Sequence, residues 1–139
     1  MFVKNRILQL VIGCLALVLA IFSALMLGGV IPTAVQPWAH AVLFVCLFIN
    51  LIEVVVYFLF AKTRISIMFC RWINLFTICV MAVALTAGFA QAAATIFTNF
   101  TINAALDLAL VFANYVMIAI IIVYLVFSKQ EQKAEKENN

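Results

Sequence analysis

The sequence predicts an all-α integral membrane protein, a four-helix bundle with both termini in the cytoplasm and with short loops. Hydrophobic residues make up 69% of the 139 residues and charged residues only 9%, whereas an ordinary soluble domain has about 25% charged residues. Four apolar segments are long enough to cross about 30 Å of hydrocarbon at about 1.5 Å per residue. Lysine and arginine are confined to three places along the chain.

The four predicted spans occupy residues 7–27, 37–61, 71–94 and 103–127. The first follows Lys4 and Arg6 like a signal peptide, but its apolar run is too long for a signal core and no clear cleavage site follows it. The spans form one transmembrane domain over 1–127, because no stretch between them is long enough for a soluble domain. The charged tail, 128–139, alternates Lys with Glu and Gln, so we expect a frayed extension of the last helix or disorder.

Glycine, proline and asparagine mark the breaks between the spans. Gly28 and Gly29 fit a helix C-terminus, and Pro32, soon afterwards, cannot continue a helix. Pro37 fits the first position of the second helix, where the missing N–H is harmless. Asn103 is expected to cap the fourth helix with its side-chain oxygen.

Positive charge predicts the orientation. The eight basic residues precede the first span, lie between the second and third, or follow the fourth: Lys4, Arg6, Lys62, Arg64, Arg71, Lys129, Lys133 and Lys136. Basic residues stay on the cytoplasmic side during insertion, so each group independently predicts that both termini and the middle loop are cytoplasmic. Because topology explains the net charge of +3, we expect a lipid bilayer around the chain and no nucleic-acid partner.

One ionisable residue, Glu53, lies deep in a predicted span, roughly 12 Å from the cytoplasmic end of its helix at about 1.5 Å per residue. Cys46, Asn50 and Tyr57 share its helical face by their i, i+4, i+7, i+11 spacing. That face must point at protein rather than lipid, because a lipid-facing carboxyl is costly. By depth, Thr77 on the third span is the expected partner of a protonated, hydrogen-bonded Glu53.

Two asparagines complete the predicted intramembrane polar cluster. Asn74 lies on the third span near the depth of Thr77, and Asn114 on the fourth span is expected beside Asn50. We favour a polar clamp that holds the helices together, since interhelical hydrogen bonds serve this purpose in membranes. A proton or ion pathway through Glu53 and a contact to a missing partner are the alternatives.

Other residue types that can carry chemistry lie apart from this cluster. His40 and Asp107 are expected near the outer ends of their helices, as isolated polar residues and not as metal ligands. Trp38 and Trp72 fit interfacial anchors. The cysteines show no metal-binding or haem-attachment spacing, and we expect all four to be small buried hydrophobic residues: Cys14, Cys46, Cys70 and Cys79. We expect no cofactor.

Small residues recur every four positions on three spans, a pattern that lets helix backbones approach closely. The stripes are Ala16, Ala20, Ala24 and Gly28 in the first span, Ala84, Gly88 and Ala92 in the third, and Ala105, Ala109 and Ala113 in the fourth. We expect them to serve packing within the chain or, alternatively, an interface with another subunit.

The motifs that usually accompany catalysis are missing from the sequence. It has no phosphate-binding glycine loop, no paired carboxylates and no nucleophile with a neighbouring histidine. We therefore expect a non-catalytic accessory or structural subunit that packs against a membrane partner or against copies of itself. The alternative is a small oligomeric proton-coupled transporter or channel that uses Glu53.

Overall fold

A computed structural model describes residues 3–30, 37–60 and 64–138 of the chain. It contains α1 (Val3–Leu27), α2 (Pro37–Phe60), α3 (Arg64–Thr98) and α4 (Ile102–Asn138). All four helices are long and apolar enough to cross a membrane, and no strand is found in these ranges. The predicted all-α class and the four candidate membrane spans are therefore confirmed.

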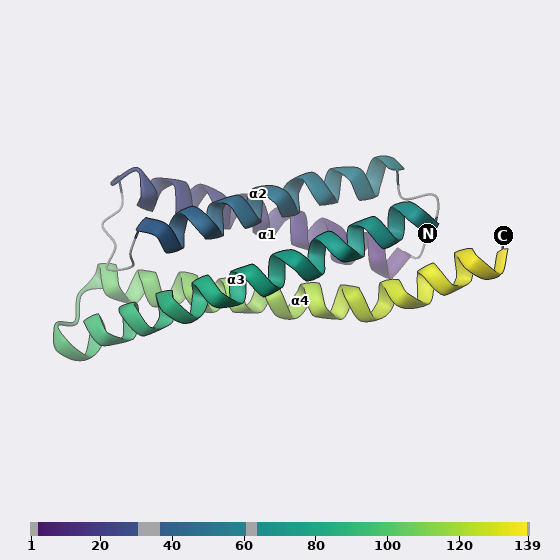
Figure 1. Cartoon of the computed structure of the whole chain (residues 1–139). Helices are drawn as coiled ribbons and strands as arrows, with labels where there is room; N and C mark the ends of the chain where they lie inside the picture. The colour runs from purple at the N-terminus through teal and green to yellow at the C-terminus, as the bar shows by residue number, and fades with distance from the viewer. Residues whose placement is uncertain (1–2, 31–36, 61–63, 139) are drawn as a thin grey trace.

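The helices lie alongside one another and alternate in direction, so α1 begins and α4 ends at the same end of the molecule (Figure 1). We call this the terminal end. The N-terminus of α3 also lies there, whereas the link between α3 and α4 lies at the opposite end (Figure 1). α1 packs against α2 and α4, and α3 packs against the same two helices. Each helix therefore has two packed neighbours.

The helices α3 and α4 extend beyond the predicted spans. α3 begins at Arg64 and ends at Thr98, outside the predicted 71–94, and α4 runs through most of the charged tail to Asn138. The apolar segment needed to cross a bilayer sets the length of a predicted span. A helix can continue past that segment wherever the polar residues are good helix formers, as Lys, Glu, Gln and Ala are.

The C-terminus of α1 has the glycine geometry that the sequence predicts. The Val30 N–H donates to the Leu25 carbonyl at 3.0 Å, and the Gly29 N–H donates to the Met26 carbonyl at 3.2 Å. Gly29 has a φ of 81°, which glycine adopts without a steric penalty. These two bonds form a Schellman motif and satisfy carbonyls that the helix itself leaves unpaired. The neighbouring Pro32 lies outside the described residues.

The start of α4 differs from the prediction. Thr101 caps the helix, because its Oγ1 accepts a hydrogen bond from the Ala104 N–H at 3.1 Å. Asn103, the predicted cap, lies inside the first turn. Threonine and asparagine are both good N-caps, and with two of them two residues apart the sequence does not distinguish between them. The start of α2 at Pro37 is as predicted.

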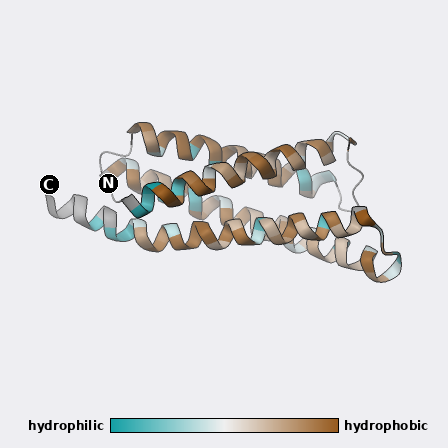
Figure 2. Cartoon of the chain, turned by 180° about the vertical axis from the view of Figure 1, so that it is seen from behind, coloured by the Kyte–Doolittle hydropathy of each residue, from teal (hydrophilic) through white to brown (hydrophobic). Residues whose placement is uncertain are grey.

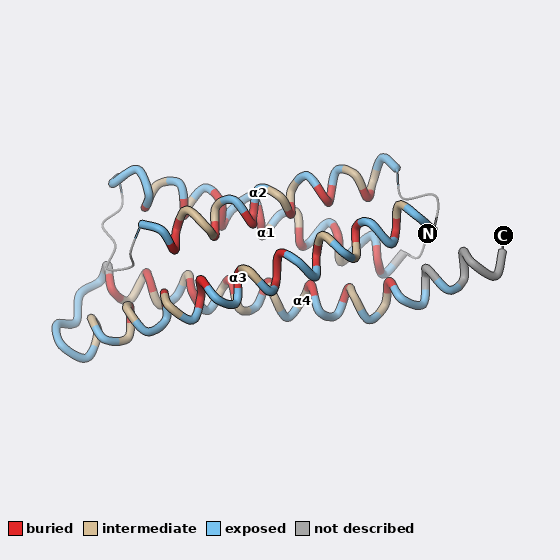
Figure 3. Tube along the Cα trace, viewed as in Figure 1, coloured by how far each residue is buried: buried red, intermediate tan, exposed pale blue. Residues whose placement is uncertain are grey.

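Buried and exposed residues separate into an inner and an outer surface. Buried positions follow the sides of the helices that face one another (Figure 3). The outer surface carries large apolar side chains, including Leu17, Phe48, Phe76 and Val116, and hydrophobic residues cover most of the helices in Figure 2. A soluble helical protein would place polar residues on this outer surface, so the exposed side chains suit a lipid environment.

Candidate functional site

Buried polar residues gather inside the chain between the terminal end and the middle of the helices. All four helices contribute to this group, which we call the polar layer: Asn5, Gln9, Asn50, Glu53, Tyr57, Asn74, Thr77, Tyr124 and Ser128. Burying polar groups in an apolar surrounding is costly unless they bond to one another. The hydrogen bonds within the polar layer therefore decide whether the layer stabilises the fold.

Glu53 lies at the centre of the polar layer, with 0% of its surface exposed. The Gln9 side-chain amide donates from Nε2 to Glu53 Oε1 at 2.8 Å, which joins α1 to α2. Asn74 and Cys70 of α3 and Tyr124 of α4 also lie close enough to interact with the carboxyl. Side chains from the other three helices thus converge on Glu53.

The expected bond between Thr77 and Glu53 is not formed. Thr77 Oγ1 lies 3.2 Å from Asn50 Oδ1 and 2.9 Å from the Asn74 carbonyl of its own helix, and its single hydroxyl proton serves these two acceptors. Asn50 Nδ2 points at Met81 Sδ, 3.9 Å away. Thr77 and Asn50 therefore make a second link, between α2 and α3. The depth of Thr77 along its helix suggested this pairing. Depth does not fix the rotation of α3 about its own axis, and this rotation decides where the Thr77 side chain points.

The two asparagines predicted to join the cluster both bond within their own helices. Asn74 Nδ2 donates to the Cys70 carbonyl at 3.0 Å, and Asn114 Nδ2 donates to the Leu110 carbonyl at 2.8 Å. We expected Asn114 to lie beside Asn50, but the amide donor of Asn114 bonds within α4 instead. A side-chain amide can reach the carbonyl one turn earlier in its own helix, and this local partner competes with partners on other helices.

Two tyrosine rings meet at the interior between α2 and α4. The rings of Tyr57 and Tyr124 are in edge-to-face contact, with centroids 6.0 Å apart and planes at 87°. Both residues have 0% of their surface exposed. Such pairs contribute about 0.5–1.5 kcal/mol beyond area burial, so this contact ties together two helices that are not otherwise direct neighbours.

Sequence reasoning missed several members of the polar layer. Asn5 and Gln9 are fully buried on α1, Tyr124 and Ser128 are fully buried on α4, and Asn5 Nδ2 donates to the Phe127 carbonyl at 3.5 Å. The sequence did contain a usable feature. Asn5 and Gln9 are two amides four residues apart at the start of an apolar span, which places them on one helical face.

A second polar group lies toward the opposite end of the molecule. Ser23 of α1, His40 of α2 and Asp107 of α4 are each at least nine-tenths buried and line one small cavity of about 20 Å³. His40 and Asp107 lie close enough to interact electrostatically. From the sequence we expected His40 and Asp107 to be isolated residues. The antiparallel packing of the helices brings them together with Ser23, which we had not considered.

The small-residue stripes are buried only in part. Ala84, Gly88 and Ala92 of α3 and Ala16 and Ala20 of α1 are buried, whereas Ala24, Gly28 and Ala109 are exposed and Ala105 and Ala113 are half-buried. At 3.6 residues per turn, four residues turn a helix by about 400°. A stripe with this spacing therefore rotates by about 40° per repeat and leaves a straight contact after two or three repeats.

The cysteines divide between the interior and the outer surface. Cys46 and Cys70 are buried, but Cys14 and Cys79 are exposed, so the expectation that all four are buried is wrong for two. A cysteine is small and apolar enough to face lipid as well as a protein core. Within the described residues, no group of three or more His, Cys, Asp and Glu side chains is placed to hold a metal ion.

Known proteins give no guide to either polar group. The chain was compared with known protein families, with curated proteins and with solved structures, and none matches.

Proposed function

We propose that the chain is a non-catalytic, multi-pass membrane protein whose four-helix bundle serves as an accessory or structural subunit for a membrane partner or for copies of itself. The observation that carries this proposal is that polar side chains of the interior bond to one another across helices. Gln9 bonds to Glu53, and Thr77 bonds to Asn50. Interhelical hydrogen bonds in membranes contribute on average about 0.6 kcal/mol each, which suits a polar clamp.

The count of donors and acceptors around Glu53 favours a neutral carboxyl. Glu53 Oε2, Gln9 Oε1 and Asn74 Oδ1 are buried without a partner of ordinary hydrogen-bond geometry among the described residues. An ionised carboxylate can only accept hydrogen bonds, whereas a protonated one adds a donor. Glu53 forms no ion pair with any described residue. A protonated Glu53 that donates toward Asn74 therefore fits the clamp better than an ionised one.

The distribution of charge supports an orientation with the terminal end in the cytoplasm. Lys4, Arg64 and Lys133 belong to segments that meet at this end (Figure 1). The opposite turn, 99–101, and the residues between α1 and α2 contain no lysine or arginine. Basic residues are retained on the cytoplasmic side during insertion, so we propose that both termini and the link between α2 and α3 face the cytoplasm.

The small residues of α4 support an accessory role. Ala109 is exposed and Ala105 and Ala113 are half-buried, so the packing of the chain itself does not use this stripe fully. Small residues allow another helix to approach closely, and close approach drives helix association where lipid removes the hydrophobic driving force. We propose that a helix of a partner, or of a second copy, packs on this side of α4.

Purification in a mild detergent tests the proposed function. We expect the chain to co-purify with a second membrane protein or to run as a defined oligomer, and we expect Ala109→Leu to release that partner while the isolated chain stays folded. Ala90→Leu is the matched control, because Ala90 is an exposed alanine on α3. A folded chain that is monomeric and free of partners in several mild detergents would contradict the accessory role.

Proton-coupled transport is the second candidate, and one observation favours it. Titratable side chains are buried at two depths, with Glu53 and Tyr124 in the polar layer and His40 and Asp107 toward the opposite end. Buried ionisable residues of this kind form proton relays in pumps and transporters. The test is proton flux into liposomes that contain the purified chain. Flux that is lost in Glu53→Gln while the fold stays intact would favour transport over the accessory role. Absence of flux would remove this candidate.

A further inference from the structure

The turn between α3 and α4 exposes large apolar side chains at the opposite end of the molecule. Phe97 has 89% of its surface exposed, Phe100 has 68% and Ile102 has 84%. We call residues 97–102 the hairpin tip. Its remaining residues are polar and uncharged: Thr98, Asn99 and Thr101. In Figure 1 the hairpin of α3 and α4 extends past the start of α2 at this end. The packing of the described chain therefore leaves three large apolar groups of the tip uncovered.

No exposed charged side chain separates the hairpin tip from the outer surface of α3 and α4. Between Arg71 and Lys129 the sequence contains one charged residue, Asp107, and only 2% of its surface is exposed. Val83 of α3 and Val116 of α4 expose apolar side chains along the way. The outer surface that suits lipid on the sides of these helices therefore continues to the tip.

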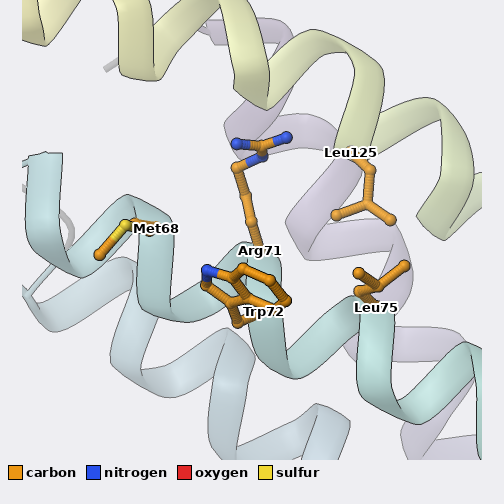
Figure 4. A pocket seen from close by; sticks show the side chains of 5 residues that line it. All are labelled: Met68, Arg71, Trp72, Leu75 and Leu125. Atoms are coloured by element: carbon orange, nitrogen blue, oxygen red, sulfur yellow. The ribbon is translucent and has the colours of Figure 1, made fainter.

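Residues at the terminal end set the level of one membrane surface. Arg71 of α3 and Leu125 of α4 extend toward each other and line one groove with Trp72, so these parts of the two helices lie at the same height (Figure 4). Lys129 follows Leu125 by about one turn of α4. Tryptophan and basic residues at the end of an apolar span are typical of the membrane interface. The headgroup layer at the terminal end therefore lies near Arg71 and Lys129.

A small apolar contact marks the other edge of the hydrocarbon. Ala39 of α2 and Ala92 of α3 are buried in one cluster, and Leu108 of α4 packs against it. At about 1.5 Å per residue, roughly 32 Å of helix separates Ala92 from Arg71, and roughly 32 Å separates Leu108 from Lys129. Both lengths agree with a hydrocarbon thickness of about 30 Å. Two helices thus place the far edge of the hydrocarbon at the same contact.

The hairpin tip lies just beyond this edge. Phe97 is roughly 8 Å past Ala92 along α3, and Ile102 is roughly 9 Å past Leu108 along α4. A bilayer measures about 30 Å across the hydrocarbon and about 40–45 Å with both headgroup layers, so each layer is about 5–8 Å thick. A helix tilt of about 20°, the average in membranes, brings the tip slightly closer to the hydrocarbon. These lengths put the tip in the headgroup layer.

We propose that the hairpin tip is a lipid-binding surface, which inserts Phe97, Phe100 and Ile102 among the headgroups of the leaflet at the opposite end. Interfacial segments with apolar and polar sides bury their apolar side chains about 5–10 Å deep at the boundary between headgroups and acyl chains. Asn99 and Thr101 are exposed polar residues and suit the water that penetrates this layer. The contact fixes the depth of the bundle in the membrane, and it does not depend on the accessory role.

Quenching of tryptophan fluorescence by brominated lipids measures the depth of the tip. The chain contains only two tryptophans, so in a Trp38→Phe, Trp72→Phe background Phe97→Trp is the single reporter. The protein is reconstituted into phosphatidylcholine vesicles whose lipids carry bromine either near the top or near the end of the acyl chains. We expect a blue-shifted emission maximum and stronger quenching by bromine near the top of the chains. Ile102→Trp, at the same level, is a second reporter in case Phe97→Trp does not fold.

Two control reporters in the same background mark the alternatives. Val83→Trp lies near the middle of α3 at an exposed position and should be quenched more by bromine near the chain ends. Lys133→Trp lies on the exposed polar part of α4 and should be quenched by aqueous iodide and by neither lipid. A tip reporter that behaves like Lys133→Trp would lie in water, and one that behaves like Val83→Trp would lie among the acyl chains. Weak quenching by both lipids and by iodide would mean that a partner or a second copy covers the tip. Each of these three results would overturn the proposal.

Discussion

Gln9 and Glu53 form a buried hydrogen bond of 2.8 Å between residues 44 positions apart in the chain. The bond links α1 to α2 at the depth where side chains of α3 and α4 also lie close to the Glu53 carboxyl. A carboxyl in a membrane interior needs such partners. The four helices are therefore held in one arrangement by a polar group that sequence reasoning paired with a different residue.

Removing the Gln9 amide should destabilise the chain. Gln9→Leu leaves Glu53 Oε1 without its donor, and an unsatisfied buried acceptor costs about 1–3 kcal/mol. We expect the free energy of unfolding in mixed detergent micelles to fall by about that amount. Leu10→Ala is the control, since Leu10 is exposed and should change stability little. Equal stability of wild type and Gln9→Leu would show that the bond contributes nothing to the fold.

Glu53 should tolerate an amide better than an apolar side chain. Glu53→Gln keeps the shape and can both accept from Gln9 and donate toward Asn74, whereas Glu53→Leu leaves both partners unpaired. We expect Gln to retain wild-type stability within about 0.5 kcal/mol, the usual range for a benign substitution, and Leu to lower it by about 1–3 kcal/mol. Thermal unfolding by circular dichroism measures the difference. A stable Leu variant beside an unstable Gln variant would mean that a charge, not a hydrogen bond, is required.

The number and class of the helices could be predicted because the apolar runs are long and the breaks are clear. Glycine at the end of α1 and Pro37 at the start of α2 have local causes that a sequence displays directly. Side-chain partners in the interior have no such local cause. Glu53 and Thr77 were matched by depth alone, but rotation of each helix about its axis decides which side chains meet, and that rotation depends on packing.

Close approach of helices was also predicted incompletely. The small-residue stripes predicted close helix contacts mainly at alanines. A tight contact between α1 and α2 instead lies at Gly13, where an added Cβ would come within 3.1 Å of Val54 Cγ1. A lone glycine inside an apolar span has no periodic neighbour to mark it. Ala24 and Ala109 carried the periodic pattern but are exposed. Periodicity thus identifies a candidate face, and only the packed partner shows where that face is used.

A matched pair of substitutions on α1 tests which part of its stripe is packed. Ala20 has 5% of its surface exposed, whereas Ala24, one turn further along, is exposed. Ala20→Leu adds bulk to a packed interior and should cost about 1–3 kcal/mol, measured as unfolding in mixed micelles. Ala24→Leu should leave the isolated chain within about 0.5 kcal/mol of wild type. The opposite ranking would show that the contact surface of α1 is rotated from the one described.

Cysteine labelling with a membrane-impermeant maleimide tests the orientation. Asn99→Cys lies in the turn between α3 and α4, and Lys133→Cys lies on the exposed polar part of α4 at the terminal end. A maleimide reacts with the thiolate, which forms in water and not in hydrocarbon, so the natural thiols Cys14 and Cys79 should stay unlabelled where lipid covers them. We expect intact cells to label Asn99→Cys only, and cells opened by mild permeabilisation to label Lys133→Cys as well. The unmodified chain is the control for background. Labelling of Lys133→Cys in intact cells would reverse the proposed orientation, and labelling of both variants in intact cells would show that the two ends of α4 lie on the same side, which would exclude α4 as a membrane span.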